Sequence, residues 1–160
     1  MSKATIGTIS HGTLRTEDLL ETFADELNRL SDNPSHNPWR VRQLIFDAQE
    51  WIAKDLSTPD LEQAVPAFAE DGSQMVGDLS DALNEYAPVY CYFGTLEGDG
   101  SDFGFWLDPD ALDEAIENSE PGDEFGEYVN EDDGVRINVS DHGNVEVYSI
   151  ESGESLLAIV

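Results

Sequence analysis

The sequence predicts an α+β fold, with N-terminal helices followed by an antiparallel sheet of about five strands that has one short acidic helix inserted. Apolar residues recur at helical spacing before residue 87 and alternate along the chain after residue 88. No internal repeat or linker divides the 160 residues. We therefore expect one compact domain over 1–160, with a helical part over about 14–87 and a sheet part over about 88–160.

The helical part is expected to begin with two amphipathic helices. The first covers 17–30, with Thr16 as its N-cap, because a capping threonine precedes a run of apolar residues at helical spacing. The second begins at Pro38, with Asn37 as its cap, because proline suits the first position of a helix. Their apolar faces consist of Leu19, Leu20, Phe23, Leu27 and Leu30 in the first helix and of Val41, Leu44, Ile45, Ala48, Ile52 and Leu56 in the second.

Two further helices are expected before the sheet. Thr58-Pro59 indicates a short helix near 59–65, which Pro66 should bend or end because proline has no N–H to donate. Another helix covers roughly 74–86 and uses Met75, Val76, Leu79, Leu83 and Tyr86 as its apolar face.

The sheet part is expected to open with a hairpin. Aromatic and β-branched residues over 89–93 predict a strand, and 103–107 should return as its partner. The acidic, glycine-rich segment 97–102 is expected to be the loop between them.

A short helix and three more strands complete the prediction. Asp108-Pro109 should cap an acidic helix over 109–118, and we expect a loop over 119–126. Short stretches of alternating or continuous apolar residues then predict strands over 135–139, 145–149 and 156–160.

The charge of the chain is its most unusual feature. Thirty-five acidic residues against seven Lys and Arg give a formal net charge of −28. The segment 55–135 contains 23 of the acids and no Lys or Arg. Such charge repels nucleic acid and anionic membranes, so neither is expected as a direct partner. The remaining explanations are a basic protein surface, a bound cation or adaptation to a salty cytoplasm.

Few residue patterns favour catalysis. The one cysteine, Cys91, excludes an intrachain disulfide, and His11, His36 and His142 are not at metal-ligand spacing. Nucleotide-binding, hydrolase and metalloprotease motifs are absent from the sequence, so we expect neither an enzyme nor a cofactor. The lack of an N-terminal apolar run or a membrane-length apolar stretch favours a cytoplasmic protein.

One loop offers a weak metal site. Glu97, Asp99 and Asp102 could supply oxygen ligands for Ca²⁺ or Mg²⁺, and the glycines between them would allow a tight backbone. The EF-hand spacing is absent, however, and the same residue types are common in ordinary hairpin turns. We therefore predict no metal site.

The densest acidic segment runs from Glu97 to Asp133 and contains 15 acids. Carboxylates every two or three residues approach the charge density of DNA, which would attract a groove built from Lys and Arg. Trp106 and Phe125 could anchor the rim of such a contact. The predicted partner-binding acids are Asp99, Asp102, Asp108, Asp110, Asp113, Glu114, Glu117, Glu120, Asp123, Glu124 and Glu127.

Three parts of the chain resemble small proteins of phages and integrated elements that have no assigned activity. They are the segment Gly7–Leu20, the pair Tyr90–Gly94 and Gly98–Trp106, and the hairpin Val139–Val145. Because no activity is assigned, the resemblance implies no catalytic residue. It does imply a context in which small acidic proteins inhibit host defence nucleases, several of them by imitating DNA.

The leading hypothesis is therefore a stoichiometric, nucleic-acid-mimicking inhibitor of a host defence nuclease or another DNA- or RNA-binding effector, of the anti-CRISPR or anti-restriction type. One alternative is a non-catalytic interaction module that binds through the Tyr90, Tyr92, Phe103 and Trp106 hairpin and uses its charge for solubility. Another is an enzyme that depends on a divalent metal ion at Glu97, Asp99 and Asp102.

Overall fold

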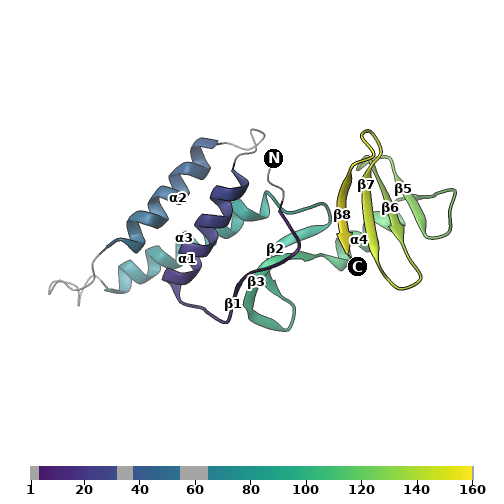
Figure 1. Cartoon of the computed structure of the whole chain (residues 1–160). Helices are drawn as coiled ribbons and strands as arrows, with labels where there is room; N and C mark the ends of the chain where they lie inside the picture. Colours follow the sequence, from purple (N-terminus) through teal and green to yellow (C-terminus); the bar gives the residue numbers. More distant parts are fainter. Residues whose placement is uncertain (1–3, 32–37, 55–64, 160) are drawn as a thin grey trace. The chain divides into compact units, whose positions relative to one another are not determined.

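The computed structural model describes residues 4–31, 38–54 and 65–159. These residues form four helices and eight strands, and the strands make one antiparallel sheet of three and another of five (Figure 1). The predicted α+β class is confirmed. Among the described residues, none of the helices combines the length and the apolar character that crossing a membrane requires.

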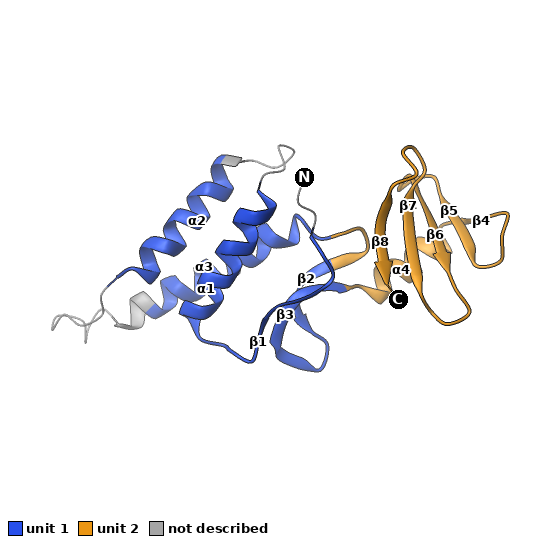
Figure 2. Cartoon of the chain, viewed as in Figure 1, with its two compact units in different colours: residues 1–87, 92–106 blue, residues 88–91, 107–160 orange. Residues whose placement is uncertain are grey.

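The chain divides into two compact units (Figure 2). Unit 1 contains 1–87 and 92–106, and unit 2 contains 88–91 and 107–160. The expectation that 1–160 fold as a single domain stays a prediction, because two compact units can still fold as one cooperative body.

Three helices form most of the core of unit 1. They are α1 (Thr16–Leu30), α2 (Pro38–Ile52) and α3 (Val65–Asn84), and each contacts the other two. The expected apolar face of α1 is buried, with Leu20, Phe23 and Leu27 fully shielded from solvent. Ala48 of α2 and Leu83 of α3 are likewise fully buried.

The start of α1 differs from the prediction. Thr16 is the first helical residue and Arg15 occupies the cap position without a capping side chain. Thr13 serves this turn instead, since its hydroxyl accepts a hydrogen bond from the Arg15 N–H and donates one to Asp18 Oδ2 over 2.7 Å. A threonine outside the helix thus holds the turn that leads into α1. The predicted cap Asn37 lies outside the described residues.

Pro66 also behaves differently from the prediction. It was expected to bend or end a short helix, but α3 begins at Val65 and continues to Asn84. Pro66 therefore lies in the first turn, where a missing N–H leaves no helical hydrogen bond unmade. The predicted helix near 59–65 lies, up to residue 64, outside the described residues.

The three-stranded sheet completes unit 1. Its strands β1 (Gly7–His11), β2 (Cys91–Leu96) and β3 (Asp99–Leu107) lie in the order β1-β3-β2. Phe93 of β2 packs edge-to-face on Phe23 of α1, with ring centroids 5.0 Å apart, so the sheet shares the helical core.

The loop predicted over 97–102 is shorter than expected. Only Glu97 and Gly98 form the turn, with Gly98 at a φ of 87°, and β3 already begins at Asp99. Asp102 pairs with His11 of β1, so a segment with the composition of a loop is extended because a distant strand lies beside it.

Unit 2 combines the predicted acidic helix with the larger sheet. The helix α4 (Pro109–Glu117) confirms the expectation for 109–118. The sheet has the order β4-β5-β6-β7-β8, with β4 at Glu120–Pro121, β5 at Glu127–Asn130, β6 at Val135–Val139, β7 at Val145–Ser149 and β8 at Ser155–Ile159. Ile137, Val147 and Leu157 face one another across three strands and are buried together.

The expected hairpins form, but the predicted strands lie in two sheets and not in one. The strands near 89–93 and 103–107 belong to the smaller sheet, whereas the last three predicted strands belong to the larger one. Two short strands that the sequence did not indicate, β4 and β5, complete the larger sheet.

Candidate functional site

The helix α4 starts with a strong local signal. Asp108 has an extended backbone and its Oδ1 accepts hydrogen bonds from the N–H groups of Asp110 and Ala111, both over 3.1 Å. Pro109 occupies the first turn, and Leu112 and Ala115 are buried. The cap, the proline and the two buried residues together fix which face of α4 points outward.

Four acids form that outward face. Asp110, Asp113, Glu114 and Glu117 are all exposed and follow the spacing i, i+3, i+4 and i+7, opposite the buried pair. We call these four residues the α4 stripe. With a helical rise of about 1.5 Å per residue, the stripe spans about 10 Å, which is on average one carboxylate about every 3.5 Å. One strand of duplex DNA has a phosphate about every 3.4 Å along its axis.

The α4 stripe has no compensating charge within its helix. The last turn of α4 contains no basic residue, although cations are favoured there. Arg136 is the one base in the sequence of unit 2, against 16 acids, and its Nη1 lies 2.9 Å from Glu127 Oε1. The stripe is therefore maintained against the repulsion between like charges and, at Glu117 in the last turn, against the helix dipole as well.

Several other predicted partner-binding acids in unit 2 are also exposed, namely Glu120, Asp123 and Glu124. Glu127 differs, because its side chain is only 11% exposed and its Oε2 accepts hydrogen bonds from the N–H groups of Asp123 and Glu124. Glu127 thus closes the loop before β5, and Asp108 caps α4. Both carboxylates have structural roles.

Asp99, Asp102 and Trp106 belong to unit 1, so the acidic segment 97–133 is divided between the two units. Asp102 is 8% exposed and accepts a hydrogen bond from the Thr8 hydroxyl. Trp106 is half-buried and donates its indole N–H to the Gly94 carbonyl. These two side chains therefore serve the sheet of unit 1.

The candidate metal ligands do not gather. Within the part of the chain that the structure describes, no three His, Cys, Asp or Glu side chains are placed to hold a metal ion, so Glu97, Asp99 and Asp102 do not form such a group. Asp99 Oδ1 instead accepts hydrogen bonds from the N–H and hydroxyl of Ser101, and these lower the pKa of its carboxyl. Its Oδ2 lies 3.7 Å from His11 Nε2.

The aromatic hairpin is mostly committed to internal contacts. The Phe103 ring packs on Phe23, with centroids 5.4 Å apart, and the Tyr92 hydroxyl donates to the Thr95 carbonyl. Tyr90, in unit 2, has a φ of 57° and donates its hydroxyl to Asp133 Oδ2 over 2.9 Å. Burial and this hydrogen bond both raise the pKa of Tyr90.

Cys91 is not prepared for nucleophilic chemistry. Burial, with a smaller contribution from the Asp108 carboxylate, raises the pKa of its thiol to about 11. A thiol with this pKa is protonated at neutral pH and reacts slowly.

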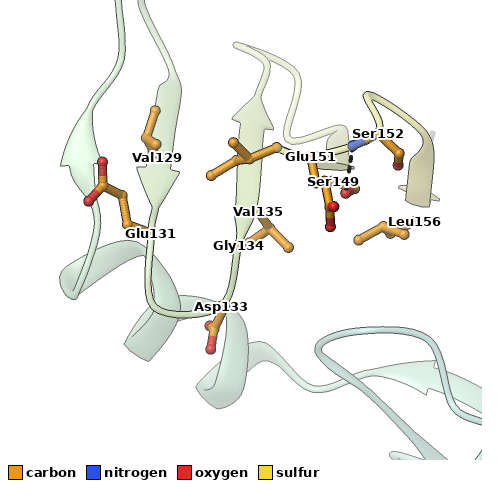
Figure 3. A pocket seen from close by; sticks show the side chains of 10 residues that line it. Val129, Glu131, Asp133, Gly134, Val135, Ser149, Glu151, Ser152 and Leu156 are labelled. Carbon is orange, nitrogen blue, oxygen red and sulfur yellow. Dashed lines mark hydrogen bonds between the residues drawn. The ribbon is translucent and has the colours of Figure 1, made fainter.

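Among the hollows of unit 2, which residue spacing did not predict, two lie beside the candidate site. One of about 580 Å³ lies at the end of the larger sheet and is lined by the turns at 131–134 and 150–152, together with Val129, Val135 and Leu156 (Figure 3). The other, of about 280 Å³, is lined by Glu114, Asp132 and Asp133 among others. Asp133 lines both. The larger hollow forms where two turns meet and the smaller one where α4 meets a turn, and residue spacing gives no signal of either.

Comparisons of the chain with known protein families, with curated proteins and with solved structures give no match.

Proposed function

We propose that this protein is a stoichiometric, nucleic-acid-mimicking inhibitor that occupies the basic binding site of a DNA- or RNA-binding effector. The α4 stripe is the central contact, and the exposed acids Glu120, Asp123 and Glu124 extend it. The partner is a protein surface rich in Lys and Arg. No catalytic step is involved, and the protein acts in the cytoplasm of the host cell.

The observation that carries the proposal is the spacing of the α4 stripe. Its four carboxylates project from one rigid helical face, and their mean axial interval is close to that of phosphates along a DNA strand. Because Asp108 caps the helix and Leu112 and Ala115 anchor it, little conformational entropy is lost when a partner binds.

The distribution of charge between the units gives further support. Unit 2 has 16 acids and one base, whereas the longer unit 1 has 19 acids and six bases. Adaptation of the whole surface to a salty cytoplasm would not favour one unit. A localised negative field steers basic partners and speeds their association.

The resemblance to small proteins of phages and integrated elements suggests the kind of target. A chain carried by such elements benefits from blocking host defence nucleases, including CRISPR and restriction effectors. These enzymes hold nucleic acid in positively charged grooves, so a rigid acidic surface is a suitable competitor.

The test begins with affinity capture from host lysate. The expected result is recovery of a nucleic-acid-binding effector that added DNA displaces and that binds less tightly as salt increases. The purified effector should then lose its nucleic-acid binding or cleavage when one equivalent of the inhibitor is present.

A matched pair of variants makes the test specific. Asp110→Asn, Asp113→Asn, Glu114→Gln and Glu117→Gln together remove the α4 stripe and should abolish inhibition. The control variant removes the same amount of charge from exposed sites of unit 1 and should keep most of the inhibition. It combines Glu21→Gln, Asp25→Asn, Glu70→Gln and Asp71→Asn. Equal effects of the two variants, or a partner that DNA does not displace, would contradict the proposal.

A further inference from the structure

The groove at the end of the larger sheet has an apolar floor. It forms where the turn after β5 meets the turn after β7, and the Ile150 N–H donates to the Gly134 carbonyl over 2.9 Å to hold them together. Val129 and Leu156 are half-buried, and Ile150 is 45% exposed although it is a large apolar residue. The groove thus offers apolar surface that the unit itself does not cover.

The rim of the same groove is acidic. Glu131 and Asp133 lie on one turn and Glu151 on the other, and all three are exposed (Figure 3). Among the described residues that line the groove there is no Lys, Arg or His. Asp133 is held in place, because its Oδ2 accepts hydrogen bonds from the Tyr90 hydroxyl and the Asn130 side-chain amide. A groove with an apolar floor and an acidic rim favours an apolar group that has positive charge beside it.

The groove is continuous with the acidic surface of α4. Asp133 also lines the smaller hollow of about 280 Å³, which is lined by Glu114 of the α4 stripe as well. A partner segment that places one side chain in the groove therefore has carboxylates on both sides of it.

We infer that the groove binds an apolar side chain flanked by Lys or Arg on the basic partner. The apolar side chain covers Ile150, Val129 and Leu156, and its basic neighbours pair with Glu131, Asp133 and Glu151. The inference depends on the proposed function in one respect, that the partner surface is basic. It adds a contact that DNA itself does not make, and thereby a reason for the inhibitor to outcompete nucleic acid.

Short synthetic peptides test this with the full chain. One peptide has a single Leu between two Lys-Arg pairs, and a second has Ser in place of the Leu. Binding is measured by fluorescence anisotropy at physiological ionic strength, where exposed charges are partly screened. The Leu peptide should bind about tenfold more tightly than the Ser peptide, a difference of about 1.4 kcal/mol.

Two variants locate the effect. Ile150→Gln should remove the preference for Leu and leave binding of the Ser peptide unchanged. Because the Ile150 side chain is exposed, this substitution should not unfold the protein. Glu131→Gln with Glu151→Gln should weaken both peptides alike. Amide chemical shifts on adding the Leu peptide should move most at Gly134 and Ile150.

Two results would overturn the inference: equal binding of the two peptides, or a preference for Leu that Ile150→Gln leaves intact. Either result would leave the α4 stripe as a purely electrostatic competitor. A clear preference for the Leu peptide, together with failure to capture any nucleic-acid-binding effector, would refute the proposed function. It would still support the groove as a binding site for an apolar side chain flanked by basic residues.

Discussion

Neutralising Glu117 should stabilise the protein, whereas neutralising Asp110 should not. Each residue has two like-charged neighbours on the α4 stripe, three or four positions away, and each such pair destabilises a helix by about 0.2–0.5 kcal/mol. Glu117 lies in the last turn, where the helix dipole disfavours an anion by about 0.3–1 kcal/mol. Asp110 lies in the first turn, where the same dipole favours it.

These contributions add for one residue and cancel for the other. Glu117→Gln should therefore raise the free energy of unfolding by about 0.7–2 kcal/mol at low ionic strength. Asp110→Asn gains from relieved repulsion about what it loses from the dipole, so its change should be close to zero. Both substitutions remove one negative charge, so the chain's overall repulsion changes equally and Asp110→Asn serves as the control.

Urea unfolding at low salt measures the difference, and a repeat near 1 M salt, where the Debye length is about 3 Å, should nearly abolish it. If the two variants shift the midpoint equally at low salt, the net charge of the chain matters and the position on the helix does not. A gain for Glu117→Gln that persists in high salt would show a packing effect. Either result would refute the electrostatic reasoning.

Three further outcomes follow from local geometry. Asp108→Ala should lower the free energy of unfolding by about 1 kcal/mol in urea titrations because it removes the α4 cap, and Asp108→Asn should stay within a few tenths because asparagine caps equally well. Gly104→Ala should cost about 1–3 kcal/mol in the same assay because its Cβ would collide with the Gly7 backbone, whereas Gly100→Ala meets nothing and should be nearly neutral. Alkylation of Cys91 at pH 8 should be about a hundredfold slower than that of an unperturbed thiol, since burial raises its pKa to about 11, and it should reach the ordinary rate once the chain is unfolded.

The elements that the sequence predicted are those with local signals. The helix α4 needs only a capping aspartate, a proline and two apolar residues, all within eight positions of one another. The tail strands β6 and β7 show regular alternation on either side of a turn. Such patterns depend on near neighbours and can be recognised without knowledge of the fold.

Two of the strands that the sequence did not indicate lack a local signal. β1 is a short segment whose partner β3 lies more than ninety residues away, and nothing within Gly7–His11 indicates that pairing. β5 begins with Glu127, a charged residue that is more typical of a loop than of a strand. In the structure Arg136 on the neighbouring strand pairs with this carboxylate. The division of the predicted strands between two sheets likewise reflects pairing that residue patterns do not indicate.

The candidate site was predictable to a similar extent. Helical spacing was sufficient to place the α4 stripe on one exposed face. It could not separate those acids from Asp102, which the fold buries beside Thr8, or from Glu127, which closes a loop. The apolar groove at Ile150 depends on two turns meeting, so no residue pattern indicates it.

The response of stability to salt separates the proposed inhibitor from a protein adapted to a salty cytoplasm. Both have a large negative charge, but an inhibitor must be folded at ordinary ionic strength, where the Debye length is about 8 Å. The Cβ atoms of stripe residues three or four positions apart lie about 5–6 Å from each other, so the repulsion between their carboxylates is largely screened once the Debye length falls below that scale. We therefore expect a chain that is folded near 0.15 M salt and a free energy of unfolding that rises with sodium chloride and levels off by about 1 M.

Circular dichroism with urea titration at each salt concentration measures how the free energy of unfolding depends on salt. Unfolding at ordinary salt, or a rise that continues to several molar, would instead favour whole-surface adaptation to salt and would remove the energetic argument for a maintained α4 stripe.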